Sequence, residues 1–244
     1  MVNLERPQRL AEPDLAKMML GAGALDIRDI SAGQEPFLYS SGNYGPGYVN
    51  VKGLVGREDV FKTLTEQCAL RLADQEADFQ FVAANATGGM VPGYQTREDY
   101  ARITGERKPY IYVRNTRKIG GHQEYTTGLT GNPEIPEGAK PLIFEELVNF
   151  AQTTGNSKVV LEEEGHTATH AGSLLTYDNP LANERLQQER LTSIWVVRLA
   201  TLLEVAAGEK AFPQVAIDDY LDFLKDPDKW QKARGYKKVN LENE

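Results

Sequence analysis

The chain has 244 residues, of which 41% are hydrophobic and 25% are charged, and its formal net charge is −8. This composition is ordinary for a folded domain with a real core, and it excludes a disordered chain, a collagen-like chain and a disulfide scaffold. The single cysteine, Cys68, can form neither an internal disulfide nor a zinc site by itself. The acidic balance argues against nucleic acid as a partner, because a general nucleic-acid binder needs a basic face to neutralise phosphates.

Membrane and export signals are weak throughout the sequence. The longest apolar run is far shorter than the about 20 residues that a bilayer-spanning helix needs, so we expect no membrane partner. The first residues lack the basic-then-apolar layout of a signal peptide. Together with the lone cysteine, this favours a cytoplasmic location.

The first half of the chain alternates between helical and strand patterns. Apolar residues at helical spacing predict a helix over residues 10–24, and short strand-like pieces with Ser- and Gly-rich turns follow over 27–50. Further on, the pattern predicts a helix over 57–73, a buried strand over 79–84 and a helix over 90–103. A short strand is also predicted at 48–51.

The second half begins with the same alternation and then changes. Strands are predicted at 108–114, 141–146 and 174–177, with a helix over 157–164 before the last of them. From Pro180 onward the strand signals stop, and helices are predicted over 186–207 and 215–224. Strands alternating with helices imply a mostly parallel sheet with helices on both faces. We therefore predict one α/β domain with a helical C-terminal appendage.

The loop after the strand at 79–84 is the first candidate for chemistry, because ligands in open parallel sheets bind beyond the carboxyl ends of the strands. It contains Thr87, Gly88 and Gly89. Glycines there allow backbone N–H groups to approach a charged oxygen group that a Cβ would block. The same residues also suit a tight strand-to-helix turn without a ligand, so this loop alone does not decide between the two interpretations.

An acidic pair and a hydroxyl-rich segment lie on the next candidate unit. Glu145 and Glu146 end the strand at 141–146, where carboxylates can hold ribose hydroxyls or Mg²⁺. Residues 153–157 lead into a helix and offer hydroxyls, free N–H groups and the positive end of the helix dipole to a phosphate. Ser and Thr are also ordinary helix caps, but the two features together on one strand–loop–helix unit favour a functional site.

The third candidate is the segment 114–125. It begins with Arg114, Arg117 and Lys118 and continues into paired glycines and His122. A loop of this kind suits closure over a polyanion, which excludes water and places positive charge where negative charge develops. The alternative interpretation is a solvated basic hairpin.

In this order the motifs resemble those of the type I phosphoribosyltransferases, and most specifically the orotate phosphoribosyltransferases. The likeness runs from about residue 20 to residue 236. Residues 37–50 are similar to the family's early base-binding hairpin, 86–90 to its pyrophosphate loop and 113–118 to its flexible catalytic loop. The strand, acid pair and hydroxyl-rich turn over 142–157 resemble the segment that binds phosphoribosyl pyrophosphate (PRPP), and the tail resembles that of the longer members.

The resemblance implies a fold and a reaction. The implied fold is the α/β type I phosphoribosyltransferase fold, with a mostly parallel central sheet flanked by helices, a small hood within residues 1–180 and a helical C-terminal extension over 181–244. The implied enzyme is a glycosyltransferase (a pentosyltransferase) of pyrimidine and UMP biosynthesis. It transfers the phosphoribosyl group of PRPP to orotate and gives orotidine 5′-monophosphate and pyrophosphate. The family implies a homodimer, with Mg²⁺ bound through PRPP and not directly by the protein.

The resemblance also implies roles for individual residues. Glu145 and Glu146 hold the ribose hydroxyls, while Arg114 and Lys118 from a neighbouring subunit stabilise the departing pyrophosphate, with His122 as a further candidate. The remaining positions are Thr87, Gly88 and Gly89 at the pyrophosphate and its Mg²⁺, Thr153, Thr154, Gly155, Asn156 and Ser157 around the 5′-phosphate, and Tyr48 with the backbone near Ser40 at the pyrimidine ring.

The catalytic loop and the base side depart from the family pattern. Asn115 stands where a Lys usually follows the loop Arg, and the loop His falls near Gly120, which leaves His122 two positions late. Ser40 replaces the hairpin Lys, and the late-strand Arg that grips the orotate carboxylate is absent from residues 176–179. The base side therefore lacks two cations of the family pattern.

The sugar side departs from the pattern in two ways. The acid pair is Glu-Glu, whereas the second position is normally Asp, so an extra methylene shifts one carboxylate. Residues 149–152 look like an insertion between the acids and the Thr-Thr-Gly turn. Acids and turn must grip one ribose phosphate together, so we expect this insertion to be the most serious departure.

Three hypotheses stay open on the sequence alone. The first is an orotate phosphoribosyltransferase, supported by the order of the motifs and by the tail. The second is a catalytically impaired relative that binds PRPP or a nucleotide as a sensor or assembly partner, supported by Asn115 and the insertion at 149–152. The third is an active transferase for an uncharged base, which the loss of the base-side cations permits.

Overall fold

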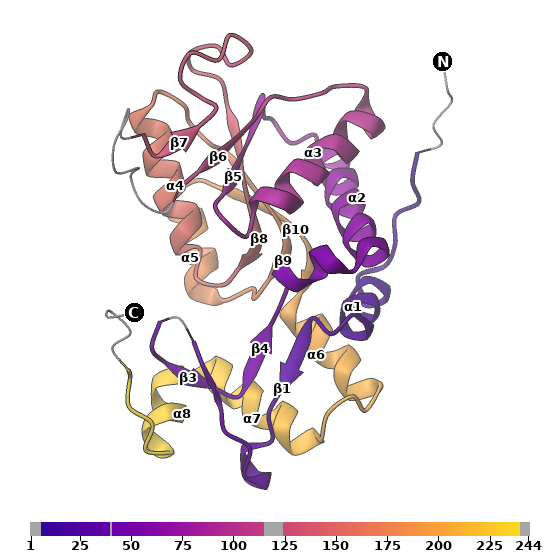
Figure 1. Cartoon of the computed structure of the whole chain (residues 1–244), viewed down its shortest axis with the longest axis vertical. Helices are drawn as coiled ribbons and strands as arrows, with labels where there is room; N and C mark the ends of the chain where they lie inside the picture. Colours follow the sequence, from indigo (N-terminus) through magenta and orange to yellow (C-terminus); the bar gives the residue numbers. More distant parts are fainter. Residues whose placement is uncertain (1–5, 40, 115–123, 240–244) are drawn as a thin grey trace.

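The computed structural model describes residues 6–39, 41–114 and 124–239. Within these ranges, a six-stranded sheet has the order β10–β9–β8–β5–β6–β7 (Figure 1). All neighbouring strands are parallel except β7, which runs antiparallel to β6. This confirms the expected α/β fold with a mostly parallel sheet. The strands are β5 (Phe81–Asn85), β6 (Tyr110–Val113), β7 (Thr126–Thr127), β8 (Pro141–Val148), β9 (His170–Thr176) and β10 (Thr192–Arg198).

Helices cover both faces of this sheet, because its strands are apolar on both sides. In β5, Val82 and Ala84 face one core and Phe81 and Ala83 face the other, as the alternation of side chains along a strand requires. The first core includes residues of α2 and α3, and the second includes Leu161 of α4. The helices concerned are α1 (Glu12–Gly21), α2 (Glu58–Asp74), α3 (Met90–Thr104), α4 (Gln152–Glu163) and α5 (Pro180–Gln188).

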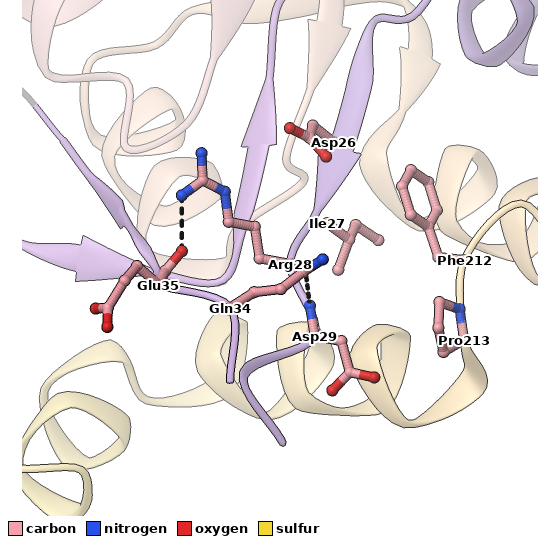
Figure 2. A pocket seen from close by; sticks show the side chains of 8 residues that line it. All are labelled: Asp26, Ile27, Arg28, Asp29, Gln34, Glu35, Phe212 and Pro213. Carbon is pink, nitrogen blue, oxygen red and sulfur yellow. Dashed lines mark hydrogen bonds between the residues drawn. The ribbon is translucent and has the colours of Figure 1, made fainter. Parts of the chain in front are cut away.

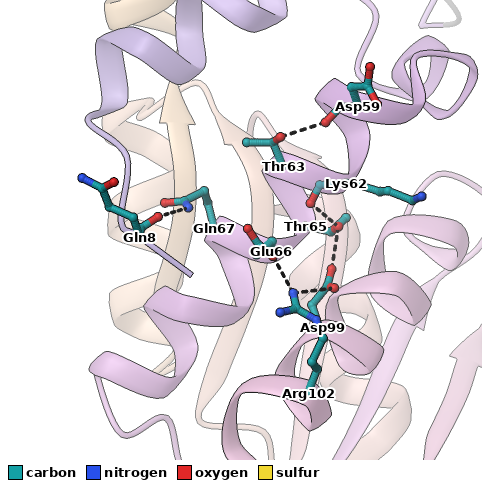
Figure 3. Close-up of polar contacts among 9 residues, drawn as sticks. All are labelled: Gln8, Asp59, Lys62, Thr63, Thr65, Glu66, Gln67, Asp99 and Arg102. Atoms are coloured by element: carbon teal, nitrogen blue, oxygen red, sulfur yellow. Dashed lines mark hydrogen bonds and ion pairs between the residues drawn. The ribbon is translucent and has the colours of Figure 1, made fainter. Parts of the chain in front are cut away.

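Polar contacts join α2 to α3 (Figure 3). The Thr65 hydroxyl donates to Asp99 Oδ2 at 2.8 Å, and the Arg102 guanidinium donates to Glu66 Oε1 at 2.5 Å and to Asp99 Oδ1 at 3.3 Å. Asp99 is buried, so these bonds satisfy a carboxylate that burial without partners would destabilise. They fix α3, the helix that follows the glycine loop of β5.

The hood, which we define as residues 25–49, consists of two short antiparallel pairs. The strand β1 (Leu25–Ile27) pairs with β4 (Gly47–Val49), and β2 (Phe37–Leu38) pairs with β3 (Tyr44–Gly45). The hood packs closely on the C-terminal helices, since a Cβ on Gly47 would lie 2.3 Å from the ring of Tyr220. Figure 1 shows the hood with these helices below the sheet. The remaining elements are η1 (Ile30–Ala32), η2 (Lys52–Gly56), α6 (Leu199–Gly208), α7 (Gln214–Lys225) and α8 (Pro227–Ala233).

The expectation of an all-helical segment after Pro180 was wrong. Residues 192–198 form β10, which pairs parallel to β9 at the edge of the sheet. Ile194, Val196 and Val197 are buried there, and β-branched residues suit a half-buried pleated strand. The sheet therefore includes residues beyond 180, and the division of the chain into an α/β unit and a helical extension stays a prediction.

Within the described part of the chain, no helix is both long and apolar enough to cross a membrane.

Candidate functional site

The topology of the sheet points to one place for a ligand. From β5 the chain passes through α3 to β6 on one side, whereas β8 lies on the other side of β5. The crevice beyond the carboxyl ends of β5 and β8 is therefore a switch point, where open α/β sheets bind their ligands. The glycine loop at 86–89 follows β5, and Glu145 and Glu146 lie near the end of β8. The structure thus brings two of the sequence-predicted motifs together.

The two glycines of this loop are in close contact with β8. A Cβ on Gly88 would lie 2.0 Å from Glu146 Oε1, and a Cβ on Gly89 would lie 2.4 Å from the backbone oxygen of Phe144. Thr87, in contrast, is exposed, and the peptide bond that precedes it is cis. The glycines are therefore needed for the approach of the loop to β8, and their contact with a pyrophosphate stays a prediction.

Glu145 and Glu146 have different surroundings, although they are neighbours on one strand. Glu145 is 8% exposed and accepts hydrogen bonds from Asn85 Nδ2, at 2.9 Å, and from the Thr154 hydroxyl. Burial raises the pKa of Glu145 to about 7; the Thr154 and Asn85 hydrogen bonds lower it, whereas the nearby charge of Glu146 raises it. Glu145 is thus a buried carboxyl group, held by neutral donors.

Glu146 faces a small hollow between the sheet and the hood. Its side chain is 18% exposed, and Lys52 Nζ lies 3.4 Å from Glu146 Oε1. Tyr48 and Asn50 line the same hollow of about 140 Å³. The predicted base-binding Tyr48 and the predicted sugar-binding Glu146 therefore lie together.

Sequence reasoning missed Lys52. Residues 48, 50 and 52 are exposed and alternate with buried Val49 and Val51, which is the period of an extended strand. Lys52 begins η2, however, so a prediction of the strand at 48–51 did not indicate where its side chain lies.

The predicted turn at 153–157 lies within the first turns of α4. The strand β8 continues to Val148 and α4 begins at Gln152, so residues 149–151 alone connect them. Ala151, the cap of α4, has the left-handed conformation with φ 53°. Residues 149–152 are thus the ordinary strand-to-helix connection and the first helical residue. The structure shows how these residues join β8 to α4, and their being an insertion relative to the family pattern stays a prediction.

The five predicted 5′-phosphate residues divide according to their side of α4. Thr154 and Ser157 are buried and face the sheet, where Thr154 binds Glu145 and Ser157 binds Asn85. Both hydroxyls donate inward here, so a contact of these two side chains with the 5′-phosphate stays a prediction. Gly155 is also buried, whereas Thr153 and Asn156 are exposed. The Gly155 amide makes the first helical bond, to Ala151 O at 3.0 Å, so the amides of residues 152–154 precede it and have no partner within the helix.

Arg114 lies beside the same first turn of α4. Its guanidinium donates to Thr127 Oγ1 at 3.0 Å and to the Tyr112 hydroxyl at 3.2 Å. Arg114 lines a hollow of about 510 Å³ together with Thr153 and Asn156. The structure therefore brings Arg114 to the helix start within its own chain. Ser40, Asn115, Lys118 and His122 lie outside the described residues.

A larger hollow, of about 580 Å³, lies between β1 and the segment that leads into α7 (Figure 2). Arg28 donates to Glu35 O there at 2.7 Å, and Asp26 and Asp29 lie nearby. It is separate from the carboxyl ends of β5 and β8, so it contributes nothing to the candidate site. Among the residues with described positions, no group of three or more His, Cys, Asp or Glu could hold a metal ion.

Comparisons with known proteins agree with the fold and with the resemblance noted in the sequence. No family model matches the chain. The orotate phosphoribosyltransferase of Coxiella burnetii is 25% identical over 218 residues, which are 89% of this chain and 97% of that protein. Orotate phosphoribosyltransferase from Aeropyrum pernix superposes with a TM-score of 0.59 at 23% identity, over 79% of this chain and 99% of that one.

A longer protein also has the same fold. The UMP synthase of Leishmania donovani superposes with a TM-score of 0.67 at 18% identity, over 88% of this chain, which spans 42% of that protein. The comparisons together confirm the resemblance to orotate phosphoribosyltransferases and the type I phosphoribosyltransferase fold.

Proposed function

We propose that this chain, an orotate phosphoribosyltransferase-like enzyme of the glycosyltransferase class, transfers the phosphoribosyl group of PRPP to orotate in pyrimidine biosynthesis. The products are orotidine 5′-monophosphate and pyrophosphate. One observation supports this most: the glycine loop of β5, Glu146 of β8 and the start of α4 lie at a single switch point of the sheet. The near full-length match to a protein of that name supports it from the sequence.

The sugar phosphate fits the edge formed by β8 and α4. The amides of residues 152–154 at the start of α4 can donate to the 5′-phosphate, which the helix dipole also favours. The exposed hydroxyl of Thr153 adds a donor at the same place. Glu146 then accepts hydrogen bonds from the ribose hydroxyls, and charge-assisted bonds of this kind are about twice as strong as neutral ones.

The reaction needs stabilisation of a leaving anion. The bond from the anomeric carbon to pyrophosphate breaks with its electron pair leaving on pyrophosphate, while a bond forms to a ring nitrogen of orotate, which releases its proton. The backbone of Thr87, Gly88 and Gly89 and the cation Arg114 lie at the ends of β5 and β6, where they can stabilise this charge. Lys118 and His122, in the segment between the described ranges, are proposed to assist. The chain otherwise contributes positioning.

The base fits against the hood. Tyr48 is 46% exposed and packs on Phe37 with ring centroids 5.6 Å apart, so its ring offers an apolar face to a pyrimidine. Ser40, which lies outside the described residues, is proposed as a further base-binding position. Lys52 lines the hollow beside Tyr48 and supplies a cation for the carboxylate of orotate. This partly replaces the two cations that the family pattern has at other positions.

Mg²⁺ and a homodimer are further parts of the proposal. Mg²⁺ prefers oxygen ligands and keeps phosphate oxygens among them. Mg²⁺ is proposed to enter the site bound to the phosphate oxygens of PRPP, without a direct protein ligand. When bound, Mg²⁺ neutralises part of the pyrophosphate charge.

The chain is further proposed to form a homodimer and to be located in the cytoplasm. Sedimentation of the purified chain tests the homodimer, and fractionation of the source cells tests the location.

An assay of pyrophosphate release tests the proposed function. Purified protein is incubated with PRPP, Mg²⁺ and either orotate, uracil or hypoxanthine. We expect pyrophosphate and the nucleotide to form with orotate alone. Release with uracil instead would favour the transferase for an uncharged base, and PRPP binding without release for any base would favour the impaired relative.

A further inference from the structure

A chain of buried hydrogen bonds connects three elements below the candidate site. The Ser157 hydroxyl of α4 donates to Asn85 Oδ1 at 2.5 Å, and Asn85 Nδ2 donates to Glu145 Oε1 at 2.9 Å. The Thr154 hydroxyl of α4 donates to the same carboxylate oxygen. Exposed fractions are 0% for Thr154, 3% for Asn85, 4% for Ser157 and 8% for Glu145. We call these four residues the buried network.

The residue types of the buried network explain how its hydrogen bonds join β5, β8 and α4. Asn85 is the last residue of β5, and its amide both accepts and donates, so it can link a hydroxyl to a carboxylate. Thr154 and Ser157 are three residues apart on α4 and therefore lie on one face of the helix. The network thus binds the first turns of α4 to the ends of both β5 and β8.

Glu145 and Glu146 differ in what they can offer a substrate. Glu145 Oε1 already accepts two hydrogen bonds from neutral groups of β5 and α4, and the titratable group that faces it is Glu146 on its own strand. The carboxylate of Glu146, in contrast, lies against Lys52 in the hollow that Tyr48 lines. One acid therefore belongs to the interior and the other to the cleft.

We propose that Glu145 is a positioning residue: through the buried network it holds the start of α4, where the 5′-phosphate binds, in register with β5 and β8. Glu146 is then the acid that contacts the ribose. This rests on the proposed function, and it replaces the expectation that both carboxylates hold ribose hydroxyls. The amides of residues 152–154 follow the loop 149–151, so their place depends on how the first turns of α4 are attached.

Substitutions can separate the two roles. Glu145→Gln keeps an oxygen that accepts from Asn85 and Thr154, so the network survives without its charge. Glu145→Ala leaves two buried donors without an acceptor, which loosens the attachment of α4. Glu146→Gln removes the charge from the cleft and leaves the network untouched. Thr154→Val is a further variant that removes one bond at nearly constant volume.

Steady-state kinetics of the whole chain tests the proposal. We expect Glu145→Gln to stay within about 3-fold of the parent in kcat/KM, and Glu145→Ala to raise the KM for PRPP about 10-fold while the KM for orotate changes little. Glu146→Gln should lower kcat/KM about 100-fold. If Glu145→Gln is impaired as strongly as Glu146→Gln, Glu145 contacts the sugar and the proposal is overturned. An unchanged KM for PRPP in Glu145→Ala overturns it equally.

Hydrogen exchange gives a second readout that needs no activity. We expect faster amide exchange over residues 149–157 in Glu145→Ala and Thr154→Val than in the parent, and parent-like exchange in Glu145→Gln. Equal exchange in all four proteins overturns the proposal, and Thr154→Val answers the question if Glu145→Ala does not fold. A parent that neither binds nor consumes PRPP refutes the proposed function, and the exchange pattern then still decides whether the network positions α4.

Discussion

The candidate site has a sugar-phosphate side, at the ends of β5 and β8 and the start of α4, and a base side, at Tyr48 and Lys52. These two sides are built in different ways. On the sugar-phosphate side, Asn85, Glu145 and Thr154 are buried and hydrogen-bonded across β5, β8 and α4. On the base side, Tyr48 is 46% exposed and the side chain of Lys52 is 62% exposed, on a short strand and a 3₁₀ helix. The first side is fixed by a sheet and the second is a surface of short elements.

This difference indicates how the site divides its tasks. Groups on a rigid scaffold suit a sugar phosphate, whose position must be accurate for displacement at the anomeric carbon. Exposed groups on loops tolerate change, and such positions usually carry differences in specificity. Changes on the sugar side should therefore alter the rate or the stability, and changes on the base side should alter the choice and affinity of the base.

The largest effect is expected at the contact between the glycine loop and β8. In Gly88→Ala the new Cβ would meet the carboxylate of Glu146, the movable end of a side chain, so the chain should fold with Glu146 displaced. We expect kcat/KM to fall about 100-fold, equivalent to about 3 kcal/mol. Gly208→Ala is the control, because nothing lies within 4 Å of a Cβ there. A fully active Gly88→Ala variant would contradict the role of Glu146.

The second effect is a dependence of the unfolding free energy on pH, caused by Glu145 on the sugar-phosphate side. Burial raises the pKa of Glu145 to about 7 from its ordinary 4.5, so the folded chain keeps this proton to a higher pH than the unfolded chain. The unfolding free energy should therefore fall as pH rises from about 4.5 through 7, by about 3 kcal/mol.

Urea unfolding of the parent and of Glu145→Gln at pH 5 and pH 8 measures this loss. Gln has no proton to lose, so the unfolding free energy of the variant should rise relative to that of the parent as pH rises. Glu209→Gln, at a surface ion pair with Lys17, is the control and should follow the parent. Parallel pH profiles for the parent and Glu145→Gln would show that Glu145 does not titrate differently on folding.

The third effect belongs to the base side. Lys52→Gln removes the cation beside Tyr48, and we expect the KM for orotate to rise about 10-fold, the loss of one charge-assisted contact, with the KM for PRPP little changed. Melting temperature should stay the same, because an exposed ion pair contributes little to stability. Lys17→Gln, far from the site, is the control. An increase in the KM for PRPP alone would place Lys52 on the sugar side.

The smallest effect is expected at Tyr48. Tyr48→Ala removes the ring that packs on Phe37, and we expect the KM for orotate to rise about 5-fold. Tyr94→Ala is a matched control, since Tyr94 is also 46% exposed but lies on α3. Equal kinetics for the two variants would mean that Tyr48 does not contact the base.

The central strands could be predicted from the sequence, because burial on both faces makes them continuous apolar runs. The run at 79–84 corresponds to β5, and 141–146 corresponds to most of β8. The edge strand β10 was missed, since its exposed and partly exposed residues interrupt the apolar run as they would on a surface helix. Edge position depends on neighbours far away in the sequence, which a local pattern does not contain.

The candidate site was predicted in part, for a similar reason. Local sequence located the acid pair and the glycine loop, because residue type and strand ends carry that information. It could not reveal that Thr154 and Ser157 face Glu145 and Asn85, because the direction of these hydroxyls depends on how α4 packs on the sheet. A Thr or Ser next to a glycine gives the same sequence pattern whether its hydroxyl caps a helix, binds a phosphate or donates a hydrogen bond to the protein interior.

A crystal structure of the chain soaked with PRPP and Mg²⁺ tests the central claim most directly. We expect the 5′-phosphate on the amides of residues 152–154 and the ribose hydroxyls against Glu146. A 5′-phosphate bound anywhere else, or a ribose that contacts neither β8 nor α4, would contradict the account.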